Sequence, residues 1–373
     1  MKTYFITGAT GAIGAQLVPL LLRDEDVQVR LLIRARNREH LDERMRGLLD
    51  FWGLKSNQFL YDRIKSCRGD ATLPLFGLAP SEYEALAGEC THVIHSAGNV
   101  RMNLPLEEAR KSSLDSAREI AAFAVRCQNA GNLRKVEFVS TVGVGGKMCG
   151  VIPEDWISQK RSFHNTYEAA KAEAEAFMHE KVQEGLPLAV HRPSMVVGAS
   201  KTGRIVHFQV FYHLCEFLSG KRTFGMLPRI EKTTLDIIPV DYVATVIAWS
   251  SNQPGTIGKV LHECSGPENA IPLEALKSQV QTVFQSRGER IPRPRNMPLP
   301  LFQAILPLVS VLATPSVKRA IKALPFFFDY LVEKQSFANS ATVAMLRPEK
   351  IELPRIGDCL EGILEYYMAR KMP

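Results

Sequence analysis

A tyrosine and a lysine four residues apart form a candidate acid–base pair. Tyr167 and Lys171 are the first and last residues of a Tyr-Glu-Ala-Ala-Lys run. In a helix this spacing places both side chains on one face. A phenol with an ordinary pKa of about 10 is a sluggish acid at neutral pH. A neighbouring ammonium stabilises the phenolate, so the tyrosine can donate a proton to a carbonyl oxygen as the carbonyl receives hydride. Because chance often produces this spacing, the surrounding elements must support it.

A third candidate, Thr141, lies upstream of this pair. The short, apolar segment 136–140 predicts a buried strand, and it runs into Ser140-Thr141-Val142-Gly143. In doubly wound sheets, ligands bind at the carboxyl ends of the strands. We expect Thr141 to hold a substrate oxygen beside Tyr167. The alternative is a strand-end threonine that bonds only to backbone.

A glycine-rich turn near the N-terminus predicts a dinucleotide site. The first predicted strand, 4–7, leads into a helix predicted over 12–23. Glycines between them allow a tight turn, close approach of the backbone to a pyrophosphate, and close packing of helix on strand. The helix N-terminus offers free N–H groups to the phosphates. The predicted binding residues are Thr7, Gly8, Thr10, Gly11, Ala12, Ile13 and Gly14.

Arginines after the second predicted strand favour NADP(H) over NAD(H). A site for NAD usually has an acidic residue there, which binds the ribose 2′-hydroxyl. In this chain the strand predicted over 28–33 ends in Arg34-Ala35-Arg36, with no acid. A guanidinium pairs with a 2′-phosphate, which a carboxylate would repel. Arg34 is the first candidate, Arg36 the second, and Arg44 in the next helix the third.

Two further strand ends supply candidates for the adenosine half of the cofactor. Asp70 and Ala71 follow the third strand, predicted over 64–69, and the carboxylate of Asp70 can accept a hydrogen bond from an adenine amino group. Ser96, Ala97 and Gly98 follow the fourth strand, predicted over 92–95, and their small size leaves room for the nucleoside.

These candidates are connected by an alternation of strands and helices. Helices are predicted over 38–51, 106–127 and 167–184, and a further strand over 189–192. Such alternation indicates right-handed βαβ units and a parallel sheet, so the predicted fold is α/β and doubly wound. We expect an NADP-binding domain over 1–203, completed by about 235–265, where a strand-then-helix pattern covers 236–250. Segments 204–234 and 266–373 would form a smaller, mainly helical substrate region, with a helix over 205–219.

The C-terminal third combines basic and apolar stretches. Four arginines between 287 and 295 precede an uncharged run over 296–317 that contains four prolines. The prolines argue against a straight membrane-spanning helix. The run is interpreted as helices over an apolar substrate cleft, and the alternative is peripheral contact of residues 287–322 with lipid.

Composition narrows the class of protein. The seven cysteines are scattered and never form Cys-x-x-Cys, which argues against a disulfide framework and against a zinc site. The N-terminus leads directly into a strand, without room for a signal peptide, so a cytoplasmic location is expected. The net charge of +7 suggests an anionic partner. Nucleic acid is disfavoured as the partner, because the sequence has neither zinc-finger spacing nor a series of aromatic residues interleaved with basic ones.

Together these motifs resemble the extended short-chain dehydrogenases/reductases. The resemblance rests on the glycine turn, Ser140-Thr141, the Tyr167–Lys171 pair and the run Arg192-Pro193-Ser194-Met195-Val196-Val197-Gly198. Finer features are similar to the thioester-reductase and fatty acyl-CoA reductase branch, among them Leu32-Ile33-Arg34-Ala35-Arg36, Ile238-Pro239-Val240-Asp241-Tyr242-Val243 and Phe337-Ala338-Asn339. Ser113 departs from the pattern, since the family helix often carries asparagine at that position.

The resemblance implies roles for particular residues. Thr141, Tyr167 and Lys171 would be catalytic, and Arg192, Pro193 and Ser194 would line the nicotinamide end of the site. Ser140 and Val196 would also bind the cofactor. NADPH would reduce an acyl thioester, held on coenzyme A or an acyl carrier protein, to an aldehyde or alcohol. The same residues also serve NADP-dependent ketone or secondary-alcohol oxidoreductases. Sugar-nucleotide epimerases and a non-catalytic NADP-binding regulator are the remaining alternatives.

Overall fold

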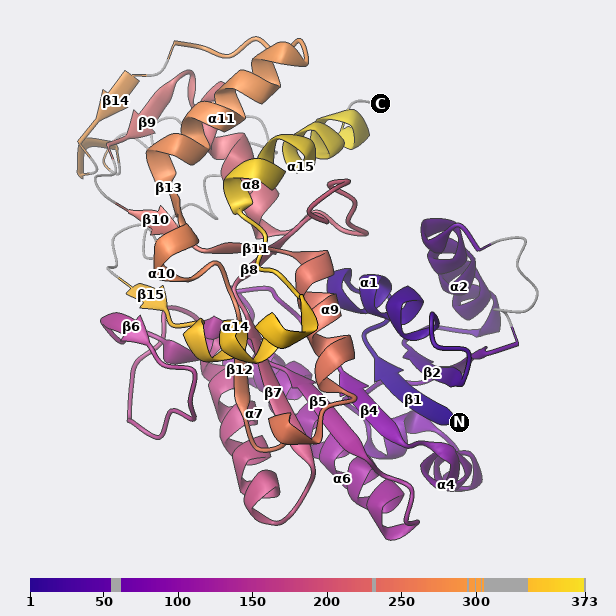
Figure 1. Ribbon diagram of the computed structural model, residues 1–373. Helices are drawn as coiled ribbons and strands as arrows, with labels where there is room; N and C mark the ends of the chain where they lie inside the picture. Colours follow the sequence, from indigo (N-terminus) through magenta and orange to yellow (C-terminus); the bar gives the residue numbers. More distant parts are fainter. Residues whose placement is uncertain are drawn as a thin grey trace.

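A seven-stranded, fully parallel sheet forms the centre of the protein (Figure 1). The computed structural model describes residues 1–54, 62–229, 233–293, 295–298, 300–302, 304 and 335–371. The strand order is β12-β7-β5-β4-β1-β2-β3. The strands are β1 Lys2–Thr7, β2 Val27–Ile33, β3 Ile64–Arg68, β4 His92–His95, β5 Lys135–Val139, β7 Leu188–Pro193 and β12 Val260–Glu263.

The order of the strands reverses between β1 and β4. From β1 the chain moves outward through β2 to β3, then returns to β4 on the other side of β1 and moves outward again. This is the doubly wound topology predicted from the sequence, and it opens a crevice at the carboxyl ends of β1 and β4. The glycine turn follows β1, so the predicted dinucleotide site lies at the reversal.

Helices cover both faces of the sheet (Figure 1). One face packs against α1, α2 and α9, and the other against α4, α6 and α7, and each face has its own apolar core. The strands are therefore apolar on both sides, as expected for a buried parallel sheet. The helices are α1 Ala12–Leu21, α2 Arg38–Trp52, α4 Pro80–Glu89, α6 Ser116–Asn129, α7 Thr166–Gln183 and α9 Val240–Ser250.

A second, mainly helical region lies beyond the carboxyl edge of the sheet (Figure 1). Its described helices are α8 Val210–Leu218, α10 Gly266–Asn269, α11 Leu273–Ser286, α14 Ser340–Leu346 and α15 Ile356–Lys371. Short strands pair within it or with the sheet domain: β6 Gly150–Ile152 with β15 Gln335–Phe337, β8 Met195–Val197 with β11 Ile237–Pro239, β9 Met226–Pro228 with β14 Arg295–Met297, and β10 Thr234–Leu235 with β13 Ile271–Pro272. Although β12 and α9 come late in the sequence, they belong to the sheet and its helical cover.

Two predicted helices differ from the observed ones. The helix predicted over 106–127 is interrupted: α5 Leu106–Arg110 is followed by a π-helical turn, Lys111–Asp115, before α6 begins. The helix predicted over 205–219 begins only at Val210, so the prediction was wrong for its first five residues. Gln209, directly before the helix, has an extended backbone, and the centroid of the Phe208 ring lies 4.8 Å from those of Tyr212 and Tyr367.

The segment proposed for lipid contact falls largely outside the described residues. Of the range 287–322, the structure describes 287–293, 295–298, 300–302 and 304. In the described part of the chain, no helix is both long enough and apolar enough to cross a bilayer.

Candidate active site and dinucleotide cradle

The tyrosine and the threonine meet where β5 ends and α7 begins. Thr141 follows β5 and caps a short 3-10 turn, its Oγ1 accepting from the N–H of Gly143 at 3.2 Å. Tyr167 lies in the first turn of α7, whose N-terminus is capped by the side chain of Asn165. Burial raises the pKa of Tyr167 to about 12, although a hydrogen bond with Thr141 acts in the opposite direction. The phenol therefore remains protonated at neutral pH, which is the form that can donate a proton.

Lys171 lies one turn further along α7 and is directed toward the sheet. Its Nζ donates to the carbonyl oxygen of Val139 at 2.9 Å and lies 5.4 Å from the centre of the Phe138 ring. Burial lowers the pKa of Lys171 to about 8, with Glu175 acting against that shift. A β carbon built on Gly98 would lie 3.5 Å from the ammonium. The structure thus brings the ends of β4 and β5 and the start of α7 to one place.

The glycine turn forms a cradle that larger residues would fill. A β carbon on Gly8, where φ is +78°, would lie 2.5 Å from the backbone nitrogen of Ala97. One on Gly14 would lie 2.3 Å from the carbonyl oxygen of Gly8. Gly11 closes the turn by donating to that same oxygen at 2.8 Å, and α1 begins immediately afterwards at Ala12, followed by Ile13. These contacts fit the close backbone approach that a pyrophosphate requires.

Side chains join the ends of β1 and β4 at the bottom of this cradle. Thr7 Oγ1 bonds to His95 Nδ1 at 2.7 Å, and the Ser96 hydroxyl donates to the carbonyl oxygen of Thr7 at 2.9 Å. The N–H of Ala97 donates to Thr7 Oγ1 at 3.4 Å. The other ring nitrogen of His95 bonds to Ser116 at 3.2 Å. Burial lowers the pKa of His95 to about 3, so this histidine is neutral and fixes the position of the two strand ends.

Arg44 crosses from α2 to the glycine turn. Its guanidinium donates to Thr10 Oγ1 and to the carbonyl oxygen of Arg34, both at 2.5 Å. The side chain of Arg34 is 78% exposed, and its Nη1 lies 3.9 Å from the carboxylate of Asp70. Two cations and one carboxylate therefore border the end of β2, next to the cradle. Asp70 is held by Thr72, which donates to it through N–H and hydroxyl at 3.0 and 2.9 Å, while the adjacent Ala71 is buried.

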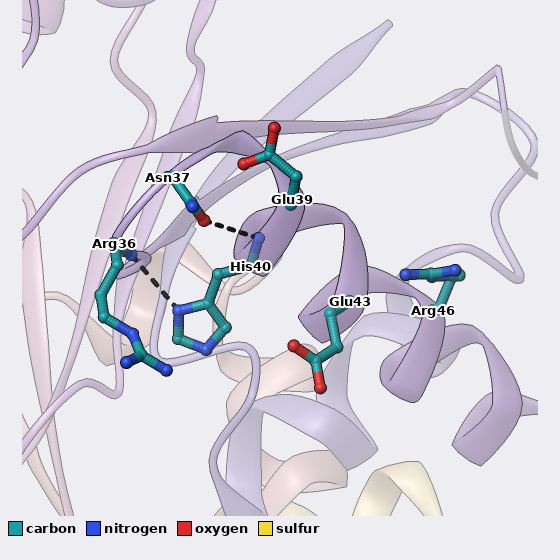
Figure 2. Close-up of a pocket in the computed structure, with 6 residues that line it drawn as sticks. All are labelled: Arg36, Asn37, Glu39, His40, Glu43 and Arg46. Carbon is teal, nitrogen blue, oxygen red and sulfur yellow. Dashed lines mark hydrogen bonds between the residues drawn. The ribbon is translucent and has the colours of Figure 1, made fainter.

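Arg36 is placed differently from Arg34 and Arg44, neither of which lines the pocket shown in Figure 2. It lines a surface pocket of about 400 Å³ together with Asn37, Glu39, His40, Glu43 and Arg46. Its backbone N–H donates to His40 Nδ1 at 3.3 Å. None of the predicted catalytic residues lines this pocket. Arg36 therefore borders this pocket, whereas Arg44 reaches the glycine turn.

The residues implied at the nicotinamide end have different surroundings. Ser140 is buried and lies directly before Thr141; its N–H donates to the carbonyl oxygen of His191 at 2.7 Å. Pro193, Ser194 and Val196 are buried where β7 passes into β8, with the N–H of Ser194 bonded to Glu263 at 3.0 Å. These segments reach the carboxyl edge of the sheet beside β5.

The guanidinium of Arg192 corrects the expectation for that side chain. It is fully buried and binds the carboxylate of Glu175, with Nη2 to Oε1 at 2.5 Å. Its Nη1 donates to the carbonyl oxygen of Pro153 at 3.3 Å and to His262 Nε2 at 3.1 Å. These protein partners occupy the guanidinium, so only the backbone of Arg192 remains as a predicted cofactor contact.

Sequence reasoning missed three features of the site. His95 was overlooked because a histidine at a strand end resembles an ordinary core residue. Glu175 continues the four-residue spacing of Tyr167 and Lys171 along α7, a signal that was present in the sequence. The π-helical turn places the buried Ser113 hydroxyl where it has no hydrogen-bond partner among the described residues. No periodicity in the sequence signals such a turn.

Comparison with known proteins agrees with this geometry. The model of an NAD-binding family described as male sterility protein matches residues 6–247, well over half of the chain. The chain belongs to this family. The match spans the cradle, Thr141, Tyr167 and Lys171, and confirms the predicted extended short-chain dehydrogenase/reductase fold and its binding of a nicotinamide dinucleotide.

Relatives of this male sterility family member are large proteins. It is 26% identical over 268 residues to the non-canonical nonribosomal peptide synthetase FrzA of a Cladobotryum species, covering 69% of this chain and 25% of that protein. It is 28% identical over 275 residues to glycine betaine reductase ATRR of Emericella nidulans, covering 70% and 21%. The chain thus matches about a quarter or less of each relative's length.

Solved structures resemble the chain over its whole length. The terminal R domain of the myxalamid PKS-NRPS pathway superposes with a TM-score of 0.82 at 25% identity, covering 100% of this chain and 92% of that one. The thiolation-reductase di-domain of an archaeal non-ribosomal peptide synthetase gives a TM-score of 0.74 at 18% identity, covering 99% and 75%. The second likeness shows the fold alone.

Proposed function

We propose that this protein uses NADPH to reduce the carbonyl of an acyl thioester held on a carrier. The observation that carries the proposal is the Thr141–Tyr167–Lys171 constellation in a chain that superposes with a terminal R domain over its full length. The relationship to a non-ribosomal peptide synthetase favours a thioester on a carrier protein. The net charge of +7 favours an acidic carrier or coenzyme A.

Thr141, Tyr167 and Lys171 have different roles in the proposed carbonyl reduction. When bound, the cofactor would supply a hydride to the carbonyl carbon. The Thr141 hydroxyl, bonded to Tyr167, fixes the carbonyl oxygen, and the Tyr167 phenol donates its proton to that oxygen as negative charge develops. The ammonium of Lys171 stabilises the resulting phenolate. The product is a hemithioacetal, whose carbon–sulfur bond breaks to release the carrier thiol and an aldehyde.

Selection of NADPH over NADH is assigned to Arg34 and Arg44. Both guanidinium groups border the end of β2, where the ribose 2′-position of a dinucleotide lies in this fold. A 2′-phosphate would bind between them by charge-assisted hydrogen bonds. Arg36 faces the separate pocket of Figure 2 and would contribute less.

The decisive experiment follows NADPH oxidation and free thiol with acyl-CoAs and acyl-loaded carrier protein, beside matched aldehydes and ketones. Equal amounts of NADPH consumed and thiol released, with aldehyde formed, support thioester reduction. Consumption with aldehydes or ketones alone would favour the ketone or aldehyde reductase alternative, a reading that the relative named aldehyde reductase lnbA also suggests. A thioester that releases no thiol while NADPH is consumed would contradict the proposal.

A further inference from the structure

Three titratable residues lie along one face of α7, and the second and third of them are buried. Tyr167, Lys171 and Glu175 follow one another at four-residue intervals, so each lies one turn from the next. Lys171 and Glu175 are 4% and 3% exposed. An isolated carboxylate at such burial would carry a large desolvation cost, so a charged Glu175 requires a partner.

Arg192 supplies that partner from the sheet. Its Nε lies 3.2 and 3.1 Å from the two carboxylate oxygens of Glu175, and its Nη2 lies 2.5 Å from Oε1. The guanidinium is oriented in turn by His262 and by the carbonyl oxygen of Pro153. Burial and the charge of Arg192 lower the pKa of His262 to about 3, and His262 Nδ1 lies 2.7 Å from the carbonyl oxygen of Ala338. His262 is therefore neutral, with Nδ1–H donating and Nε2 accepting from Arg192.

We propose that the Glu175–Arg192 pair positions Lys171 and keeps its ammonium protonated at the working pH, an inference that rests on the function proposed above. Arg192 fixes the carboxylate one turn below Lys171. The carbonyl oxygen of Val139 accepts a hydrogen bond from the ammonium and holds it beside Gly98. The negative charge of Glu175 acts on the ammonium from one turn further along α7. Glu175 and Arg192 are positioning residues, because they act through Lys171.

The other titratable groups in this region do not stabilise the Lys171 ammonium. His95, at the end of β4, is neutral because burial and Lys171 lower its pKa to about 3. Arg192 on β7 and Arg161 before α7 are cations that interact with Glu175, and cations disfavour a further positive charge. Glu168 on α7 bonds to His164 at 2.9 Å and acts on Tyr167. Glu175 is thus the carboxylate that offsets the loss of solvation at Lys171.

Glu175→Gln tests the proposal because it removes the charge and preserves the side-chain shape. The wild-type protein, labelled with ¹³C-lysine, is titrated by NMR, and the Lys171 signal is assigned by its loss in Lys171→Met. This titration should give a pKa of about 8 for Lys171. In Glu175→Gln its midpoint should fall by about one pH unit. If turnover needs the ammonium, the variant should be nearly as active as wild type at pH 6 and about tenfold slower at pH 9. A purely structural role would slow turnover equally at both values.

Glu173→Gln is the matched control. Glu173 also pairs with an arginine, Arg110, at 2.8 Å, and lies on the same helix, but it is half-exposed and on another face. The Lys171 titration should not change in this variant. Glu175→Asp keeps the charge but retracts it by one methylene. The Lys171 titration midpoint in this variant should therefore lie between those of wild type and Glu175→Gln. If Glu175→Gln does not fold, Glu175→Asp replaces it as the test variant.

A Lys171 signal that titrates as in wild type in every folded Glu175 variant would overturn the proposal, and so would an equal shift in Glu173→Gln. The titration needs no substrate, so it is independent of the reaction. A protein that reduces no thioester yet shows the shift would refute the proposed function and leave the electrostatic role of Glu175 standing.

Discussion

The guanidinium of Arg44 donates a hydrogen bond to the hydroxyl of Thr10, which joins helix α2 to the glycine turn. Because the same guanidinium also holds the carbonyl oxygen of Arg34, it braces the end of β2 where a 2′-phosphate would bind. We expect Arg44→Ala and Arg34→Ala each to raise the Kd for NADPH by about 10- to 100-fold and to change the Kd for NADH far less. Fluorescence titration with both cofactors measures this.

Arg46→Ala provides the control for that experiment. Arg46 lies on the same helix but faces the surface pocket of Figure 2, so its loss should leave both affinities unchanged. An equal loss of NADH and NADPH affinity in Arg34→Ala would refute the phosphate contact.

Tyr167→Phe removes the proton donor and little else. The ring keeps its packing, so NADPH should bind with nearly unchanged affinity, while turnover should fall by about 10²- to 10⁴-fold. Stopped-flow absorbance at saturating NADPH separates the two effects. Turnover near the wild-type rate would exclude Tyr167 as the donor.

Gly14→Ala tests the cradle. Its β carbon would meet the Gly8 carbonyl oxygen at 2.3 Å, so the turn must open. We expect about 2–3 kcal/mol of destabilisation together with loss of NADPH binding. Gly47→Ala, in the interior of α2 with open space around it, should instead gain about 0.5–1 kcal/mol and bind normally. Urea unfolding gives both values, and equal behaviour of the two variants would contradict the steric argument.

A buried charge network makes stability depend on pH. His191 lies between Glu137 and Glu263, at 2.7 and 2.5 Å, and Lys135 approaches Glu137 at 3.1 Å. Burial opposes the protonation of His191, but the two carboxylates outweigh it and raise the pKa of His191 to about 9. The stabilisation is therefore fully present below the unfolded value of about 6.5 and is lost as pH rises through 9.

We expect the free energy of unfolding to fall by a few kcal/mol between pH 6.5 and 9.5. In His191→Gln the protein should be less stable at pH 6.5 and should lose most of this dependence. Urea unfolding at several pH values provides the measurement. A variant that keeps the full wild-type slope would show that other groups are responsible.

The sheet and its reversal could be predicted because their signals are local. Strand segments of four to seven residues alternate with helical ones, and the glycine turn marks the crevice. The choice of Thr141, Tyr167 and Lys171 as candidates rested on equally local signals. Two of them lie on one helix, and the third follows the end of a strand.

Features that depend on packing could not be predicted. Glu137, His191 and Glu263 are charged or polar residues inside buried strands, and only the pairing of β5, β7 and β12 brings them together. The same holds for Arg192, whose partner Glu175 lies on α7. The run Arg192-Pro193-Ser194 at the end of a predicted strand indicates that these residues reach the carboxyl edge of the sheet. It does not indicate on which face of the sheet the Arg192 side chain lies.

The pairing of β15 with β6 has a consequence for biosynthesis. Gln335 donates to the carbonyl oxygen of Gly146, 189 positions earlier, and so ties a late segment to the loop that follows Thr141. Contacts of such long sequence separation form slowly, because the loop-closure entropy must be overcome first. On the ribosome, the strands up to β7 emerge well before β15, so the nucleotide cradle can assemble while the β15 partner of β6, beside the loop that follows Thr141, is still missing. The cofactor site should thus mature before the substrate site during synthesis.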